Sequence, residues 1–482
     1  MNILFTNDIE AQPEKTAAAA ARARPDVWCA MNPAYCDAVI SWLQIILYER
    51  FGHRFTFSQT DPNWVRIGVA GWPGTIRIAS DATTFARADS NLRFTEWDGA
   101  AEGWIMPLGK SLPAPGVSSL PDPLIQKCNT GFTFYYDVLG LAYWMLSRQE
   151  EVGRSDLDHH HRFPARSSHA SKHDYLERPI VDEWLDVLGQ AMQKLWPGLT
   201  LTRHTFVMRV SHDVDYPSRY AFTSFKYLLR IMASDAIRGY QRLNMLRAPL
   251  SWLRTDTRLY QGDPFNTFDW IMDRSELHGL TSAFYFICGR TDPALDARYE
   301  PEHRAIRELM RRIHARGHEI GLHPSYNTYK SPETLVSEAN RLKMVCSQES
   351  IEQAQWGGRM HFLRWNTPTT LYGWEQAGMA YDSTLSYADR PGFRCGTCLE
   401  YPAFDPVRKK MLNVRIRPLV AMECTVMAER YLGLGSGDAA REKFVQLKDA
   451  CRAVNGVFTL LWHNSELDTK QKRQLYASLL ST

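Results

Sequence analysis

The sequence lacks the features that mark membrane, secreted and nucleic-acid-binding chains. Its longest apolar runs, such as AVISWLQIILY at residues 38–48, are shorter than the ~20 residues that a bilayer span needs. The opening residues, MNILFTNDIEAQPEK, have no basic flank, long apolar stretch or cleavage site of a secretory signal. A net charge of +3 over 482 residues is too small for the excess of basic residues that is typical of a nucleic-acid-binding protein. We expect a cytoplasmic protein with no transmembrane segment and no nucleic-acid partner.

The number and the distribution of the cysteines argue against a disulfide scaffold. The nine cysteines are scattered and odd in number, whereas disulfide frameworks pair evenly in small secreted domains. One C-x-x-C, formed by Cys395 and Cys398 in FRCGTC, has no second pair, so we interpret it as a structural loop, with zinc or redox use as the minor alternative. Hydrophobic residues at 44% and charged residues at 23% are typical of a globular protein.

The first 200 residues divide into two predicted parts. Residues 1–125 mix a helix at 34–51 with strand-like VRIGVA and TIRIAS, which predicts a mixed α/β N-terminal domain. This part ends in proline-dense LPAPGVSSLPDP, a pattern typical of a linker. Residues 126–202 show helical apolar spacing in FYYDVLGLAYWMLSRQEE and IVDEWLDVLGQAMQKLW, which predicts a helical connecting region. The sequence leaves open whether these residues shape a substrate groove, self-associate or bind a partner.

The connecting region contains a polar, histidine-rich segment, DLDHHHRFPARSSHASKHD. Its three consecutive histidines, at 159–161, can bind adventitious metal, but we expect them to be solvated.

From residue 203 strands and helices alternate. Strand candidates are FVMRV, SAFYFIC, HEIGLH, HFLRW, AYDST, NVRIRPLV and GVFTLLW. The helix in PEHRAIRELMRRIHARG places Ile306, Leu309, Met310 and Ile313 on one face and ends at Gly317, a favoured C-terminal cap. Strand–helix–strand alternation predicts parallel pairing, in an open sheet or a barrel, over residues 203–482.

Polar residues follow several of these strands, at the ends where active residues collect in barrels. The set comprises His212, Asp213 and Asp215; His323 and Asn327; Arg364 and Asn366; Asp382; and His463 and Asn464. Each signal is weak alone, but together they predict one convergent site.

Asp213 and Asp215 are the sharpest pair. Residues i and i+2 of an extended chain project to the same face, and two close carboxylates resist joint ionisation without a cation or fixed hydrogen bonds. Nearby histidines suit a zinc-type metal. The alternative is that both aspartates cap a helix or turn beside Pro217. The equivalent positions of His323 and His463 favour the metal site.

The order HDVD, GHEIGLHPSYN, an arginine-bearing strand and a final LLWH resembles the polysaccharide deacetylases, the NodB-homology enzymes of carbohydrate esterase family 4. The resemblance covers about residues 203–470. DSTLSYADRPGFRCGTC and WHN resemble a bacterial branch with an extra N-terminal domain. The resemblance implies a distorted, incomplete (β/α) barrel that holds one divalent metal ion, most often zinc.

The resemblance also implies residue roles. Asp213 matches the general base, His463 the general acid and Arg364 the arginine that orients the base. Asp215 and His323 match metal ligands. Two departures stand out: Val214 separates the two aspartates, which are adjacent in the family, and the second histidine of the H-x-x-x-H pattern is replaced by Asn327.

Five further residues are predicted to contact substrate. Tyr326 and Trp365 can stack on a sugar, Arg394 can bind an acidic group, and the strand-end carboxylates are the remaining candidates. These carboxylates are Asp382 and Asp405. Core packing, capping or salt bridges are the alternative interpretation of all five.

The resemblance implies an N-deacetylase that acts on an N-acetylated amino sugar, such as a nucleotide- or lipid-linked saccharide, during surface polysaccharide or lipopolysaccharide synthesis. Two alternatives stay open: a non-catalytic saccharide-binding protein, suggested by Asn327, and a hydrolase of another non-peptide C–N bond.

Overall fold

The computed structural model describes residues 36–237 and 242–481. The opening segment on which the cytoplasmic prediction depends lies outside the described residues. Within the described ranges, no helix combines the length and the apolar character that crossing a bilayer requires.

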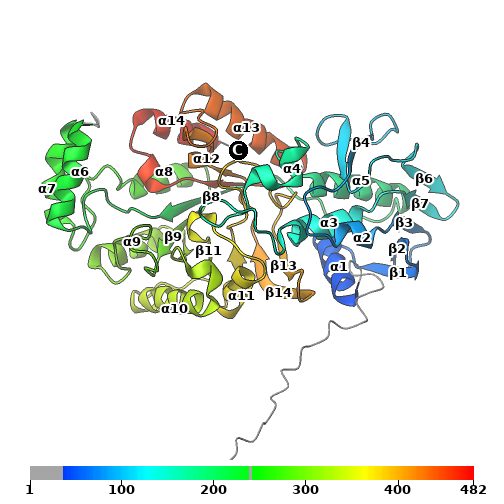
Figure 1. The fold of residues 1–482 in the computed structure, drawn as a ribbon, viewed down its shortest axis with the longest axis horizontal. Coiled ribbons are helices and arrows are strands. Elements are labelled where there is room, and N and C mark those ends of the chain that lie inside the picture. The colour runs from blue at the N-terminus through cyan, green and yellow to red at the C-terminus, as the bar shows by residue number, and fades with distance from the viewer. Residues whose placement is uncertain (1–35, 238–241, 482) are drawn as a thin grey trace, which may run out of the picture.

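The N-terminal part is built around a five-stranded sheet, which lies at the right of Figure 1. Its strand order is β1 (Phe55–Asp61), β2 (Trp64–Val69), β3 (Thr75–Ala79), β7 (Gly131–Phe134) and β6 (Ile125–Cys128). A separate hairpin pairs β4 (Phe94–Asp98) with β5 (Ser111–Pro115). The helices are α1 (Asp37–Phe51), α2 (Ala82–Phe85), α3 (Val138–Leu146), α4 (His169–Lys172) and α5 (Ile180–Leu195). Of these, α1, α3 and α5 contact the sheet.

This sheet crosses the boundary predicted at residue 125, because that boundary falls inside β6. The proline-dense segment expected as a linker begins with β5, where Leu112 and Ala114 are fully buried. Proline is tolerated here because this two-stranded hairpin leaves each strand one unpaired edge.

The C-terminal part contains a nine-stranded sheet. Its order is β13 (Tyr401–Asp405), β14 (Lys410–Ile416), β12 (Tyr381–Asp382), β11 (Gly357–Gly358), β10 (Glu319–His323), β9 (Ser282–Ile287), β8 (Val207–Val214), β16 (Val457–Leu461) and β15 (Ala421–Met422). All neighbours are parallel except β13 and β14. The carboxyl ends of β8, β10 and β16 therefore meet at one edge.

Helices alternate with these strands, as the sequence predicts. They are α6 (Phe225–Ile237), α7 (Arg242–Arg254), α8 (Phe268–Leu277), α9 (Arg304–Ala315), α10 (Pro332–Gln348), α11 (Thr369–Gln376), α12 (Glu423–Met427), α13 (Asp438–Ala453) and α14 (Lys470–Leu479). The apolar face expected for α9 is buried at all four positions. Gly317 follows α9 with φ +77°, the left-handed conformation of a glycine cap.

The mixed α/β class is confirmed, whereas the barrel stays a prediction. The pairing order has two ends, β13 and β15, and among the described residues these two strands do not pair with each other. One predicted strand, HFLRW, is wrong: His361–Leu363 form a 3₁₀ turn in which Phe362 and Leu363 have φ of 61° and 55°.

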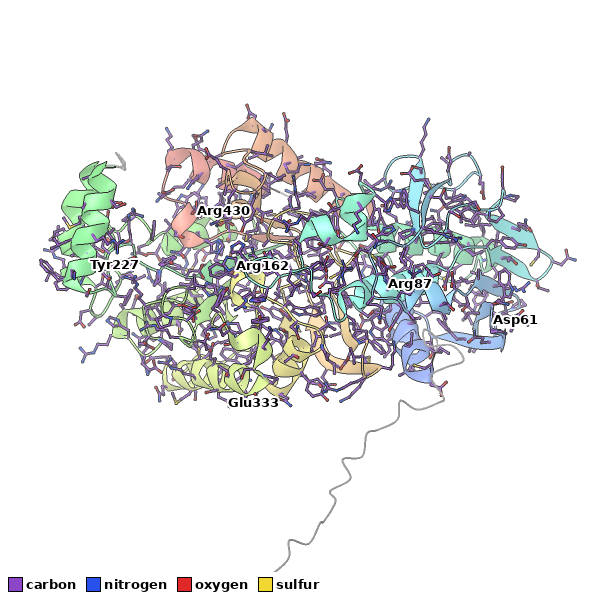
Figure 2. All side chains as sticks on the ribbon, viewed as in Figure 1. Asp61, Arg87, Arg162, Tyr227, Glu333 and Arg430 are labelled. Atoms are coloured by element: carbon purple, nitrogen blue, oxygen red, sulfur yellow. The ribbon has the colours of Figure 1, made fainter. Side chains whose placement is uncertain are left out.

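The two parts share one hydrophobic core, which runs from Val39 to Leu480. Helix α1 packs on β13 and β14, where the Trp42 indole donates to the Pro402 carbonyl at 2.9 Å. Arg162, from the histidine-rich segment, lies near the middle of the molecule (Figure 2). The N-terminal part thereby reaches the edge where the polar strand ends meet.

Candidate metal and catalytic site

The end of β8 presents both aspartates to one histidine. The Nε2 atom of His323 lies 3.3 Å from Oδ1 of Asp215 and 3.7 Å from Oδ2 of Asp213. Strand β8 is flanked by β9 and β16, so both aspartates lie at the end of an interior strand of the sheet. The i, i+2 spacing places both carboxylates at this histidine despite the intervening valine.

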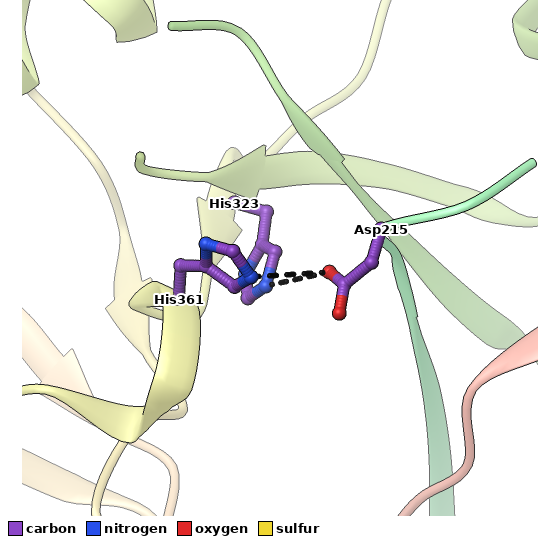
Figure 3. A group of neighbouring side chains, drawn as sticks. All are labelled: Asp215, His323 and His361. Atoms are coloured by element: carbon purple, nitrogen blue, oxygen red, sulfur yellow. Dashed lines mark ion pairs between the residues drawn. The ribbon is translucent and has the colours of Figure 1, made fainter. Parts of the chain in front are cut away.

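Asp215, His323 and His361 form a group whose candidate ligand atoms all lie within 4.8 Å of one another (Figure 3). The two histidines are buried, and His361 Nε2 lies 3.7 Å from Asp215 Oδ1. Two imidazole nitrogens and one carboxylate oxygen are a donor set that suits a zinc-type ion. Three protein ligands also match catalytic zinc sites, which keep a position for water or substrate.

The surroundings of this group orient its ligand atoms. His323 Nδ1 is hydrogen-bonded to the Arg359 carbonyl, and His361 Nδ1 lies 3.1 Å from Oδ1 of Asp296. Each Nδ1–H is thereby engaged, which leaves each Nε2 lone pair facing Asp215. The buried Oδ1 of Asp215 has no hydrogen-bond partner among the described residues. The residues present therefore fit a divalent cation.

The electrostatics of the group favour positive charge at its centre. Burial disfavours the charged form of His361, but the Asp215 and Asp296 carboxylates outweigh it and raise the pKa of His361 to about 9. Burial likewise acts to raise the pKa of Asp215, yet the facing histidines hold it well below its ordinary value.

Arg359, and not Arg364, holds Asp213. The fully buried Arg359 guanidinium contacts Asp213 Oδ1 at 2.7 Å and donates to the Ser383 carbonyl at 2.9 Å. Arg364 instead donates to the backbone carbonyls of His160 and Tyr326. The prediction for Arg364 was wrong because the 3₁₀ turn after β11 carries it away from the strand edge that Arg359 occupies.

Asn327 is not part of the metal group, which corrects the second prediction. Its side chain is exposed, donates to the Thr291 carbonyl at 3.2 Å and accepts from Arg364 at 3.1 Å. His361 provides the third ligand atom. The family spacing H-x-x-x-H pointed to position 327, whereas the histidine of MHFLRW, two residues after Arg359, was the available signal.

His463 lies on the other side of Asp215. Its Nε2 is 3.7 Å from Asp215 Oδ2, and its Nδ1 is hydrogen-bonded to buried Glu423 at the start of α12. Burial acts to lower the pKa of His463, but the carboxylates of Glu423 and Asp215 raise it well above its ordinary value. Glu423 was missed from sequence because it lies 40 residues before its partner, at the end of the short strand β15.

Glu423, Cys424 and His463 also lie close enough together to form a second candidate metal group. The Glu423 carboxylate instead accepts the hydrogen bond of His463 Nδ1, which makes this an orienting pair for the histidine.

The five predicted substrate contacts are buried, each less than a tenth exposed: Tyr326, Trp365, Asp382, Arg394 and Asp405. Arg394 forms an ion pair with Glu151 at 2.6 Å. Burial raises the pKa of Asp382 to about 6, while Thr384 donates to its carboxylate. Asp405 accepts from the backbone of Val407 and Arg408. These contacts correct the prediction that the carboxylates and Arg394 face substrate.

An open cleft of about 480 Å³ adjoins the group instead. Its lining includes Asp215 and the buried Asp296, together with the exposed Tyr227 and Arg230 of α6. The Arg298 guanidinium lies 3.5 Å from the centre of the Tyr227 ring. A substrate therefore has room to approach Asp215 from the side of α6.

The histidine-rich segment of the N-terminal part packs against the turn that carries His361. Arg162, held by Asp158 at 2.7 Å, donates to the Phe362 carbonyl at 3.0 Å. The His160 ring packs 4.7 Å from the Phe362 ring and contacts the Tyr326 hydroxyl at 2.9 Å. The expectation of solvated histidines thus fails for His160.

Comparisons with known proteins bear on parts of the chain. A family model described as a family of unknown function (DUF7033) matches residues 33–197. No curated protein matches the chain.

Among solved structures, the chain is similar to a putative polysaccharide deacetylase from Mycobacterium smegmatis (17% identity, 58% of this chain, 85% of that chain, TM-score 0.34). It is also similar to Puue allantoinase (11% identity, 57% of this chain, 83% of that chain, TM-score 0.33). A third similar structure is a probable polysaccharide deacetylase from Pseudomonas aeruginosa PAO1 (14% identity, 59% of this chain, 85% of that chain, TM-score 0.33).

Proposed function

We propose that the protein is a metal-dependent hydrolase of a non-peptide C–N bond, which removes the acetyl group from an N-acetylated amino sugar. The substrate class follows the sequence resemblance, and we extend the proposal to a saccharide of surface polysaccharide or lipopolysaccharide synthesis. Zinc is the expected ion, because the donor set combines two imidazoles and one carboxylate.

One observation supports this proposal most strongly. Two separately oriented titratable residues, Asp213 with Arg359 and His463 with Glu423, flank a single metal-type group. Amide hydrolysis needs a base for the attacking water and an acid for the departing amine. A binding protein has no use for both.

Asp213 would act as the general base. The Arg359 guanidinium pairs with its carboxylate and fixes one oxygen, Oδ1, so the other, Oδ2, is directed towards His323. Asp215, His323 and His361 would hold a divalent cation, which would supply Lewis-acid polarisation of the amide carbonyl and of a water. Asp213 would take a proton from that water as it attacks the carbonyl carbon.

His463 would act as the general acid. Its charged form is stabilised by Glu423, and its Nε2 faces the cluster. Proton transfer from Nε2 to the amine nitrogen lets the C–N bond break, and acetate and the free amino sugar then separate. Glu423 holds the imidazole in the orientation that this transfer needs.

The alternatives now differ in strength. The non-catalytic interpretation rested on Asn327 as a poor ligand, and His361 removes that reason. Hydrolysis of a different C–N bond would use the same residues, so only the identity of the substrate distinguishes this alternative from the deacetylase.

Acetate release tests the proposal. The purified, zinc-loaded chain should release acetate from N-acetylated amino sugars and lose this activity on chelation. Asp213→Asn should retain the metal and lose roughly 10²- to 10⁴-fold in rate. Release of ammonia or formate from other amides, with no acetate from any N-acetylated sugar, would instead support the alternative hydrolase.

A further inference from the structure

The helix pair α6–α7 presents an unusual surface at the end of the molecule. Figure 1 shows it at the left, beyond the sheet and the helices that cover it. The pair has its own small core, separate from the main one, formed by Tyr220, Leu228 and Ala248. Buried polar contacts fasten it to the body, including the ion pair between Arg219 and Asp235.

Exposed apolar side chains concentrate on this pair. Of fifteen large apolar residues exposed among the described residues, five lie on these two helices of 13 residues each: Phe225, Tyr227, Leu229, Leu250 and Leu253. Phe225 and Leu229 are one turn apart, as are Leu250 and Leu253, so each helix carries an apolar stripe. No described element covers these stripes.

The charged residues of the pair are nearly all basic. Five of the six charged residues in the two helices are basic, and the sixth, Asp235, is buried against Arg219. Lys226, Arg230, Arg247 and Arg254 are exposed and take part in no ion pair within the described ranges.

We propose that the α6–α7 pair docks on an anionic lipid bilayer. Aliphatic and aromatic side chains flanked by unpaired basic ones match a membrane interface, where the former enter the acyl boundary and the latter meet phosphates. A second copy of the chain is a poorer match, because two copies of this face would bring like charges together.

Docking would place the candidate site beside the bilayer. The cleft that reaches Asp215 is also lined by the exposed Tyr227 and Arg230 of the docking helix α6. On the proposed function, this favours a lipid-linked saccharide over a free one as substrate. Docking itself does not depend on that function.

Vesicle sedimentation of the full chain tests the proposal. The protein should pellet with vesicles of equal phosphatidylglycerol and phosphatidylcholine and stay in solution with phosphatidylcholine alone. Leu253→Ser and Arg254→Glu should each weaken binding roughly fivefold or more.

Matched controls lie elsewhere on the surface. Leu277 on α8 is 67% exposed, the same as Leu253, so Leu277→Ser should bind like the unsubstituted protein. Arg166→Glu, at an exposed site of the N-terminal part, should do so too. Asp213→Asn should bind vesicles normally, which separates docking from catalysis.

Three results would overturn the proposal. They are absence of the unsubstituted protein from the anionic pellet, equal binding by Leu253→Ser and Leu277→Ser, and a fall in solution mass caused by Leu253→Ser. The last result would identify the stripe as a contact between copies of the chain.

Discussion

Arg359 and Arg364 are five residues apart, but the turn between them gives their side chains different partners. Arg359 directly follows β11, so its guanidinium reaches Asp213 on β8 across β10 and β9. Arg364 comes after the left-handed residues Phe362 and Leu363 and turns towards backbone carbonyls. The role that we propose for the Arg359 side chain is positioning, because its guanidinium acts on the chemistry through Asp213.

Substitution Arg359→Lys should lower turnover roughly 10- to 100-fold while metal stoichiometry stays at one, because lysine cannot reproduce the planar fork that fixes the base. Arg394→Lys is the matched control, since Arg394 is equally buried and pairs with Glu151 away from the metal group. Both variants should lose about 1–3 kcal/mol of unfolding free energy. Equal losses of turnover in the folded variants would contradict the positioning role.

His169 should make the fold sensitive to acid. It is fully buried and contacts the Tyr175 hydroxyl and the Leu92 carbonyl. Burial, with the neighbouring His173, lowers the pKa of His169 to about 4. The unfolded chain then binds the proton first, so the unfolding free energy should fall by roughly 1.4 kcal/mol per unit as pH drops from about 6.5 to 4.

His169→Gln tests this contribution, because an amide can keep both hydrogen bonds without titrating. Denaturant unfolding across the same pH range should show a shallower slope for the variant. An unchanged slope would assign the acid sensitivity to other groups, such as the neighbouring His173.

At the scale of elements, the turn His361–Leu363 depends on a segment about 200 residues earlier in the chain. Two consecutive non-glycine residues in the left-handed region cost of order 1–3 kcal/mol each and persist only where the surroundings fix them. Arg162 supplies such a contact at the Phe362 carbonyl. The part of the chain matched to a family of unknown function thus supports the turn that carries a candidate ligand.

Arg162→Ala should weaken divalent-metal binding roughly 10- to 100-fold, measured by calorimetric titration of metal-free protein, because His361 loses its fixed position. Arg154→Ala is the control: Arg154 lies two residues before this segment and contacts Asp156 and Ser90, not the turn. Amide exchange over residues 357–366 should rise in the first variant alone. Equal affinities and equal exchange in both variants would show that the segment only covers the turn.

For the whole molecule, the sequence predicted what depends on local pattern. The α9 face, the strand ends at Asp213, His323 and His463, and the mixed α/β class follow from periodicity and strand signals. Contacts between segments that are distant in the chain could not be predicted from the sequence. The presence of His361 in the ligand group in place of Asn327, and the pairing of Glu423 with His463, depend on how strands that are distant in the chain align.

Metal stoichiometry in a matched pair of variants tests the central claim most directly. Purified protein dialysed against zinc should hold one ion per chain, measured by mass spectrometry of its metal content. His361→Ala should lose that ion, whereas Asn327→Ala should retain it, because only His361 belongs to the ligand group. Loss of the ion from Asn327→Ala with retention in His361→Ala, or no bound ion in the unsubstituted protein, would contradict the account.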